Sequence, residues 1–175
     1  MSVNTPGGRA APTSIQQMLL FRINRYFGAA GGVAMRMCEA HFGVTRREWG
    51  VMATVANHEG LLSSELAERA QLDRARTSRA LSGLEDKGWV LRTPLPGDRR
   101  RVAVSLTAEG RRMYGLILPR MAQIHLDLVS VLSDEELAQF DTLLAKLQGH
   151  AVALAADGRY DALPRVDRAR HRRAR

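Results

Sequence analysis

Residues 73–107, DRARTSRALSGLEDKGWVLRTPLPGDRRRVAVSLT, decide the fold that we expect for this chain. Asp73 is a good N-cap, because its carboxylate can accept hydrogen bonds from the free N–H groups of a first helical turn. Between this cap and a glycine suited to a left-handed helix end, one face repeats small or apolar residues at helical spacing: Thr77, Leu81, Leu84 and Gly88. The segment therefore begins with a predicted helix that packs this narrow face inward.

The opposite face of the predicted helix is cationic. It consists of Arg76, Arg79 and Gly83, with Arg74, Ala75 and Ser82 beside them. We expect no acidic partner at helical spacing for these arginines, because the acids of the helix are Asp73 at its cap and Glu85 and Asp86 beyond them. A solvated cationic face is the usual explanation of such a pattern, but the neighbouring segments favour contact with a nucleic acid.

A β-hairpin is predicted after the helix. Residues 90–93 and 102–106 have the pattern of strands, the second with alternate residues inward: Val102, Val104 and Leu106. The turn between the strands is expected to contain Pro94, Pro96 and Gly97. Residues 98–101, DRRR, would then form a cationic tip that a two-stranded ribbon can project into a groove of DNA.

The segment before the helix, LLSSELAERAQL at residues 61–72, predicts a short helix with Leu66 and Ala67 inward. A short helix, a tight turn and a second helix form a helix-turn-helix, in which the second helix lies in the major groove. Residues 69–101 also carry nine basic side chains against four acidic ones. Charge and order of elements both indicate a polyanionic partner.

These residues resemble the MarR family of bacterial winged helix-turn-helix regulators. The resemblance covers about residues 44–147 and rests on Trp49, ELA at 65–67, LDRARTSRALSGLEDKGWV at 72–90, DRRRVAVSLT at 98–107, and Gly110. It implies a homodimer that binds a pseudo-palindromic operator, usually as a repressor, and that is released by a small aromatic or phenolic ligand or by cysteine oxidation. It also implies that Arg100 enters the minor groove with Asp98 orienting it.

Two positions depart from the family pattern. Leu62 stands where a capping Ser or Thr is usual, so we expect the cap to shift to Ser63. Arg76 stands where a small hydroxyl residue is common, so the operator sequence does not follow from the resemblance. The DNA-binding residues that we predict are Ser63, Ser64, Arg74, Ala75, Arg76, Ser78, Arg79, Asp98, Arg99, Arg100 and Arg101.

The remaining segments predict long helices on both sides of this lobe. Three capping boxes mark helix starts, at Ser14 with Gln17, Thr45 with Glu48, and Ser133 with Glu136, and Thr107 is a further cap. Glycines at 28, 31 and 32 interrupt the first helix and favour close packing against another helix, while Pro119 should bend the helix after the hairpin. Apolar helices at both ends have little core to cover, so we expect them to pair with a second subunit.

The predicted fold class is mainly α with a small β-hairpin wing (α+β). We expect a disordered leader at 1–13, a winged-helix domain at 14–156 and a basic tail at 157–175. Within the domain, the DNA-reading lobe spans about 45–107 and the dimerisation helices span about 14–41 and 108–156. The tail, with six arginines and one acid in 165–175, is expected either to add phosphate contacts or to remain a solvated segment.

Composition narrows the function classes. The chain has 175 residues, a formal charge of +8 and one cysteine, Cys38, which fits a reducing cytoplasm. We expect no membrane span, no signal peptide, no metal and no cofactor, because the sequence lacks long apolar runs and the motifs of nucleotide, zinc or redox sites. An enzyme is therefore the poorer hypothesis. A sequence-independent architectural DNA-binding protein is the main alternative.

Three residues near the junction of the first two helices are candidates for the ligand site: His41, Arg46 and Trp49. An aromatic ring and a cation can hold an aromatic carboxylate, although Trp49 has a simpler role in the core and Arg46 a simpler role on the surface. Cys38 is interpreted either as a small buried hydrophobe beside Met35 and Met37 or as a redox sensor.

Overall fold

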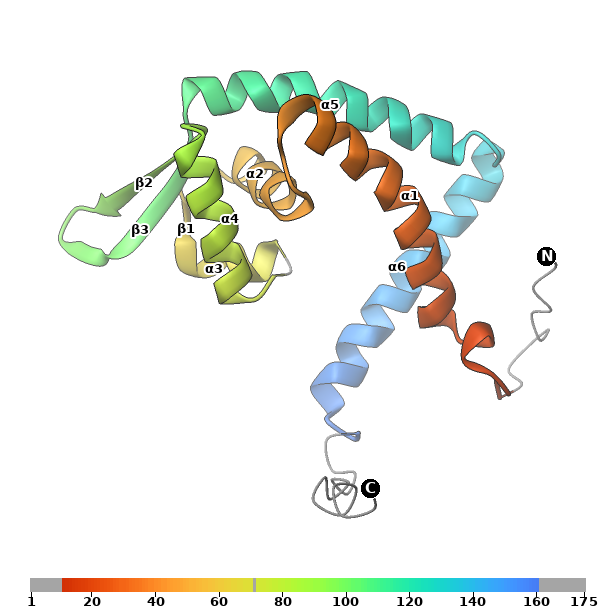
Figure 1. Ribbon diagram of the computed structural model, residues 1–175. Helices are drawn as coiled ribbons and strands as arrows, with labels where there is room; N and C mark the ends of the chain where they lie inside the picture. Colours follow the sequence, from red (N-terminus) through yellow and green to blue (C-terminus); the bar gives the residue numbers. More distant parts are fainter. Residues whose placement is uncertain (1–10, 71, 161–175) are drawn as a thin grey trace, which may run out of the picture. The chain divides into compact units, whose positions relative to one another are not determined.

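The computed structural model of the chain describes residues 11–70 and 72–160. By its internal contacts the chain divides into two units, Met1–Leu128 and Val129–Arg175. The first contains, in order, η1 (Ile15–Gln17), α1 (Leu19–Phe42), α2 (Arg46–Asn57), β1 (Leu61–Leu62), α3 (Ser63–Arg69), α4 (Arg74–Asp86), β2 (Val90–Leu95), β3 (Asp98–Leu106) and α5 (Ala108–Val129), whose end falls at the boundary (Figure 1). The second contains α6 (Asp134–Asp157). The predicted fold class, mainly helical with a small hairpin, is confirmed.

Four of the predicted helix caps are present. Asp73 Oδ1 accepts from the backbone N of Arg76 at 2.7 Å, and Thr107 Oγ1 accepts from the backbone N of Gly110 at 2.9 Å. Thr45 and Ser133 each form a complete capping box with the glutamate three residues later. The last helix runs through the alanine-rich segment and ends at Gly158, which is left-handed with φ of 64°.

The capping box expected at Ser14 is wrong. Gln17 Oε1 accepts hydrogen bonds from the N and Oγ1 of Thr13, at 2.9 and 3.2 Å, and the Ser14 side chain makes no capping bond. The segment forms only the 3₁₀ turn η1, and α1 begins at Leu19 after an extended Met18. The shift of a cap to Ser63 is also wrong, because Leu62 is the N-cap of α3 and the Ser63 hydroxyl donates to Val102 O at 3.2 Å.

The sheet has three strands in the order β1-β3-β2, with both pairs antiparallel. The sequence predicted only the hairpin, because β1 is two residues long and lies where the upstream helix was expected to begin. The hairpin is also longer than predicted, since Pro94 pairs with Val102 and only Pro96 and Gly97 turn the chain. Residues 98–101 therefore start β3 instead of forming the tip. Pro94 is tolerated because β2 is an edge strand.

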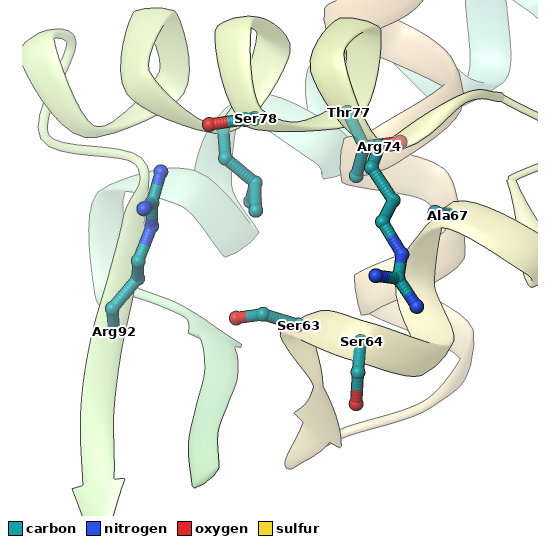
Figure 2. A pocket seen from close by; sticks show the side chains of 8 residues that line it. Ser63, Ser64, Ala67, Arg74, Thr77, Ser78 and Arg92 are labelled. Atoms are coloured by element: carbon teal, nitrogen blue, oxygen red, sulfur yellow. The ribbon is translucent and has the colours of Figure 1, made fainter. Parts of the chain in front are cut away.

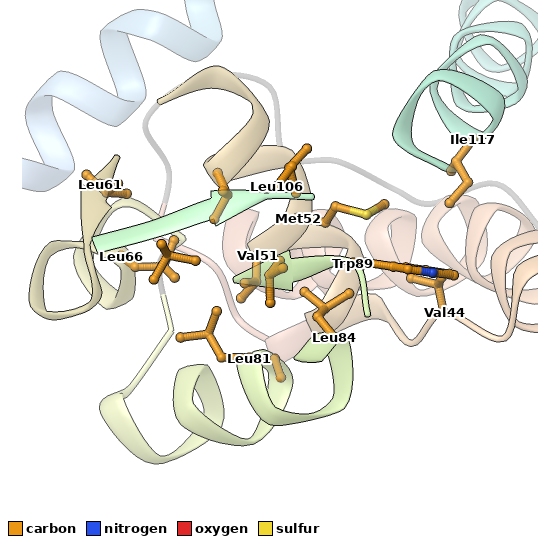
Figure 3. Close-up of a cluster of buried hydrophobic side chains, with 14 of the residues drawn as sticks. Val44, Val51, Met52, Leu61, Leu66, Leu81, Leu84, Trp89, Leu106 and Ile117 are labelled. Atoms are coloured by element: carbon orange, nitrogen blue, oxygen red, sulfur yellow. The ribbon is translucent and has the colours of Figure 1, made fainter. Parts of the chain in front are cut away.

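One apolar core holds the lobe together (Figure 3). Its fully buried members come from several elements: Val51, Met52 and Val55 of α2, Leu66 of α3, Leu84 of α4, Val104 of β3 and Ile117 of α5. The first turn of α5 lies directly against the chain entering β2, because a Cβ on Gly110 would overlap the carbonyl oxygen of Trp89. Farther along α5, Tyr114 stacks on Trp49 of α2 with ring centroids 5.5 Å apart. The core thus fixes α4 and the hairpin to the start of α5.

Helix α1 is continuous through its three glycines. The predicted close packing holds at Gly31, where an added Cβ would lie 2.8 Å from Arg46 Nη2, but the neighbour is a side chain of α2 and not a helix backbone. Gly28 has no atom within 4 Å of an added Cβ in the single chain. Over the described residues no single helix is long and apolar enough to cross a membrane, and only α5 and α6 taken together, across the break between them, pass such a test of length and composition.

Candidate nucleic-acid interface

Helix α4 presents four different strips along its length, because successive residues of an α-helix are rotated by about 100°. The buried strip consists of Thr77, Ala80, Leu81 and Leu84. Opposite to it lies an exposed outer ridge of Ala75, Arg79 and Ser82. Between them, the wing flank carries Arg74 and Ser78 and the α2 flank carries Arg76 and Gly83. The predicted inward face is confirmed for Thr77, Leu81 and Leu84, whereas Gly88 is exposed beyond the end of the helix. The five DNA-binding residues predicted on α4 are all exposed.

The turn from α3 into α4 is fixed by backbone bonds at both sides. Leu72 N donates to Ala67 O at 2.9 Å, and Thr77 N donates to Asp73 O at 2.9 Å. Leu66 and Ala67 anchor α3 in the core, as predicted. A short helix, a turn and a cationic second helix are the elements of a helix-turn-helix, and α4 has the place of the helix that enters the major groove.

A wing-side hollow of about 280 Å³ opens between α3, α4 and β2 (Figure 2). It is lined by Ser63, Ser64, Ala67, Arg74, Thr77, Ser78, Leu81 and Arg92. Arg92 Nη2 pairs with Glu85 Oε2 at 3.0 Å, while its Nε is buried without a hydrogen-bond partner among the described residues. Hydroxyl groups and guanidinium groups on three elements therefore face one space that suits anionic oxygens.

A neighbouring hollow of about 250 Å³ shares three of these residues, Ser63, Ser64 and Arg92, and extends to Arg101 at the start of β3. The side chains of Arg101 and Asp98 are exposed. Asp98 nevertheless interacts with another group of the protein. The backbone of Arg99 and Arg100 belongs to β3, but their side chains are outside the described part of the structure. Residues 161–175 of the predicted basic tail at 157–175 and most of the leader also lie outside the described residues.

The α2-side hollow, about 220 Å³, lies on the other side of α4 and is lined by Thr45, Arg47, Glu48, Arg76, Arg79 and Ala80. The expectation that the α4 arginines have no acidic partner at helical spacing is wrong for Arg76, whose Nε lies 3.1 Å from Asp73 Oδ2. Asp73 reaches it because the capping side chain folds back over the first turn, three residues from Arg76. Gly83, predicted on the cationic face, instead makes room for the carboxylate of Glu48.

Glu48 is the buried acid of this region. Burial opposes its charge, but hydrogen bonds from the Lys87 ammonium and from the Thr45 backbone outweigh that effect, so the pKa of the Glu48 carboxyl lies below its ordinary value of 4.5. Lys87 Nζ pairs with Glu48 Oε1 and also donates to Gly83 O at 3.4 Å. This pair joins the first turn of α2 to the last turn of α4 and so sets how α4 projects from the core.

Comparison with known proteins agrees with this geometry. Residues 42–101 match the family model described as MarR family. The transcriptional regulator HosA of Escherichia coli O111:H- is 31% identical over 104 residues, which cover 59% of this chain and 77% of that protein. The transcriptional repressor MdtR of Bacillus subtilis (strain 168) is 33% identical over 105 residues, covering 60% of this chain and 68% of the other. The chain belongs to the MarR family.

Solved structures show the same fold. The transcriptional regulator PA4135 superposes on this MarR-family chain with a TM-score of 0.67 and 27% identity, covering 75% of this chain and 96% of that one. BpsR of Bordetella bronchiseptica superposes with a TM-score of 0.71 at 18% identity, covering 79% and 98%. The chain is therefore a MarR-family transcriptional regulator with a winged-helix fold.

The three residues predicted for a ligand site have separate neighbours in this MarR-family chain. The guanidinium carbon of Arg46 lies 4.4 Å from the centroid of the Phe27 ring, and Trp49 stacks on Tyr114. His41 is exposed in the last turn of α1. Arg46 and Trp49 thus connect α2 to α1 and to α5, and a role in ligand binding remains a prediction.

Cys38 is fully buried in the MarR-family fold, with its Sγ 3.8 Å from Met121 Sδ. Burial, and after it the charge of Glu39, raises the pKa of the Cys38 thiol above its ordinary value. Because the thiolate is the reactive form of cysteine, both effects disfavour oxidation. The geometry supports the interpretation of Cys38 as a small buried hydrophobe.

Sequence reasoning missed two side chains at the candidate interface, Arg92 and Arg47. Arg92 carried a signal, since it follows Val90 by two residues and so shares the inward face of a strand that alternates. An arginine at an inward position indicates an acidic partner, which here is the partly exposed Glu85. Arg47 carried no such signal, because its place beside α4 follows only from the packing of α2 on α4.

Proposed function

We propose that this MarR-family regulator is a sequence-specific repressor that binds a pseudo-palindromic operator as a homodimer. The observation that carries the proposal is the division of α4 into a buried strip and an exposed ridge of Ala75, Arg79 and Ser82, with cationic hollows on both flanks. In the major groove such a ridge faces base edges, and an arginine there can bond a guanine through two donors. The repressor role is supported by the name of the relative MdtR.

The domain division supports the same proposal. We assign DNA reading to the lobe at about 45–107 and dimerisation to the helices before and after it, at about 14–41 and 108–156. Large apolar side chains are exposed along these helices in the single chain, among them Leu20, Tyr26 and Phe27 of α1 and Phe140 of α6. Burying them against a second copy removes apolar surface from water. The leader at 1–13 and the tail at 157–175 lie outside this division, and the tail is proposed to contact phosphates.

The wing completes the proposed binding mode. We assign the minor-groove contact to Arg100, with Arg99 and Arg101 beside it, on the resemblance of the segment at 98–107. Specific readout is preferred to architectural binding because α4 is capped by Asp73 and held to the core at both ends, so its arginines have a defined register on DNA. A narrow, A·T-rich minor groove should favour the inserted arginine.

Selection of binding sites from a random duplex pool tests the proposal. We expect the enriched DNA to contain an inverted repeat with half-sites about one helical turn apart, since two-fold symmetry of the protein is mirrored in its site. The complex with one such duplex should contain two protein chains by analytical ultracentrifugation. Enrichment of no sequence, or binding of one chain to a single half-site, would contradict it.

We also propose that a small aromatic or phenolic acid releases the operator. A ligand changes DNA affinity only if it binds the DNA-competent and incompetent arrangements unequally. A coupling of about 1–3 kcal/mol would change operator affinity by about five- to 150-fold. His41, Arg46 and Trp49 are the proposed contacts. Titration of the selected operator with and without each aromatic acid that raises the Tm tests this, and stabilising acids that leave operator affinity unchanged would refute it.

A further inference from the structure

The α2-side hollow places an arginine of α2 beside two arginines of α4. Arg47 lines the hollow together with Arg76 and Arg79, although it lies 29 residues before the nearer of them in the sequence. The preceding residue, Arg46, has a different neighbour, the Phe27 ring of α1. Adjacent residues on a helix point about 100° apart, so one arginine contacts α1 and the next faces α4.

The ion pair between the buried Glu48 and the partly exposed Lys87 places the helical turn that carries Arg47. Glu48 Oε2 accepts from Thr45 N at 2.8 Å, and its other oxygen pairs with Lys87 at the C-terminal end of α4. Gly83 permits this approach, because a Cβ at that position would overlap the Glu48 carboxylate. The first turn of α2 is therefore held against α4, and Arg47 is fixed at the edge of the hollow.

Within the part of the chain that the structure describes, the charges around the hollow are not balanced. The acid that lines it, Glu48, is already neutralised by Lys87, and Asp73 is engaged by Arg76. Among the described residues Arg47 has no ion-pair partner, and the hydrogen bond from Arg79 Nε goes to Ala75 O of its own helix at 3.3 Å. Guanidinium groups gathered in this way repel one another unless an anion lies between them, and paired oxygens of phosphate fit their planar donors.

DNA supplies such an anion on both sides of an inserted helix. The major groove is about 12 Å wide, close to the diameter of an α-helix with its side chains, so each flank of the helix faces one sugar-phosphate backbone. On the wing flank of α4 the lining groups are Ser63, Ser64, Arg74 and Arg92. On the α2 flank they are Thr45, Arg47 and Arg76.

We propose that Arg47 and Arg76 together bind a backbone phosphate of duplex DNA on the α2 side of α4, on the strand opposite to the one that faces the wing-side hollow. This inference rests on the proposed function, because it requires α4 to lie in the major groove. It assigns Arg76 to a phosphate and leaves base recognition to Arg79 on the outer ridge. Arg47 thereby extends the DNA-binding surface to α2.

The first test measures the salt dependence of binding to the selected operator and to a scrambled duplex. Each phosphate contact adds about −0.9 to the slope of log K against log salt. Arg47→Ala should therefore make this slope shallower by about one and weaken both duplexes by the same factor, whereas Arg47→Lys should retain the slope. Arg112→Ala is the matched control, because this α5 arginine is exposed and pairs with Glu109. Equal thermal unfolding of the variants confirms that the fold is intact.

The second test locates the phosphate. A set of operators is prepared, each with a single neutral methylphosphonate at a different position. The affinity of the wild type and of Arg47→Ala is measured for each operator. We expect one position per half-site at which the variant loses less affinity than the wild type, because only the Arg76 contact is left to lose there. If there is no such position, this inference is overturned and the proposed function is not. The same holds if Arg47→Ala leaves the slope unchanged while the wild type binds its operator. Failure of the wild type to select any sequence overturns the proposed function as well.

Discussion

The DNA-reading lobe and helices α1 and α6 differ in where their large apolar side chains lie. Within the lobe, Met52, Leu66, Leu84 and Val104 are completely buried. Along α1 and α6, side chains of the same kind are exposed, with Leu20 at 80% and Val152 at 72%. Since about 25 cal/mol is gained for each Å² of apolar surface buried, the lobe can be stable within one chain. Helices α1 and α6 would instead gain stability from the second copy that we propose.

The largest expected effect is that of a substitution in the core of the lobe. Leu84→Ala removes a fully buried side chain between the DNA-reading helix and the sheet and should lower the free energy of unfolding by about 2–5 kcal/mol. Denaturant titration measures it. If the lobe is stable on its own contacts, the loss should be the same at low and high protein concentration. A loss that grows on dilution would show that the stability of the lobe's core depends on dimerisation.

A smaller effect is expected from a substitution in α6, and it should depend on the protein concentration. Phe140→Arg introduces a charge at an exposed apolar position of α6, which the proposed dimer buries. The loss of about 1.5–3 kcal/mol per large side chain would weaken dimerisation about tenfold or more. Sedimentation velocity over a dilution series measures the shift. Leu91→Arg, at an exposed apolar position of β2, is the matched control, and equal shifts for both variants would contradict the assignment.

The next effect in size concerns the ion pair between Glu48 and Lys87, of which Glu48 is buried. Glu48→Gln leaves Lys87 without its anion and should lower the free energy of unfolding by about 1–2 kcal/mol near neutral pH. The folded pKa of Glu48 is lower than its ordinary value of 4.5, so its stabilising contribution is complete above that pH and is lost as the pH falls through the folded pKa. The wild-type and variant curves of stability against pH should therefore converge in acid. Parallel curves down to the acid limit would show that the charge of Glu48 contributes nothing.

Much of the fold could be predicted from the sequence because its signals are local. The inward strip of α4 follows from helical spacing, and the caps at Asp73, Thr45, Thr107 and Ser133 follow from side-chain chemistry within one turn. Strand β1 could not be predicted, because two residues carry no periodicity and the pairing of Leu61 with Val104 joins distant parts of the chain. The capping box expected at Ser14 is absent for a local reason, since Gln17 Oε1 accepts hydrogen bonds from Thr13 instead.

The candidate interface could be predicted only in part. The exposed arginines of α4 are visible in the sequence, because a helix with one apolar face must present the other. The division of those arginines between an outer ridge and a flank depends on where α2 and β2 pack. Arg47 lies far before α4 in the chain, and Arg92 follows it on the next strand. Both join the surface of α4 only in the folded lobe, through the pairs Glu48–Lys87 and Glu85–Arg92.

We propose that the outer ridge of α4 reads bases while its flanks bind phosphates. The decisive measurement is the ratio of affinities for the selected operator and a scrambled duplex, taken for Arg79→Ala and Arg47→Ala at one salt concentration. We predict that Arg79→Ala lowers this ratio by a factor that corresponds to about 1–3 kcal/mol of binding free energy, the discrimination expected of a good bidentate base contact. Arg47→Ala should leave the ratio unchanged while weakening both complexes. An Arg79→Ala variant that loses the same affinity for both duplexes would contradict the claim.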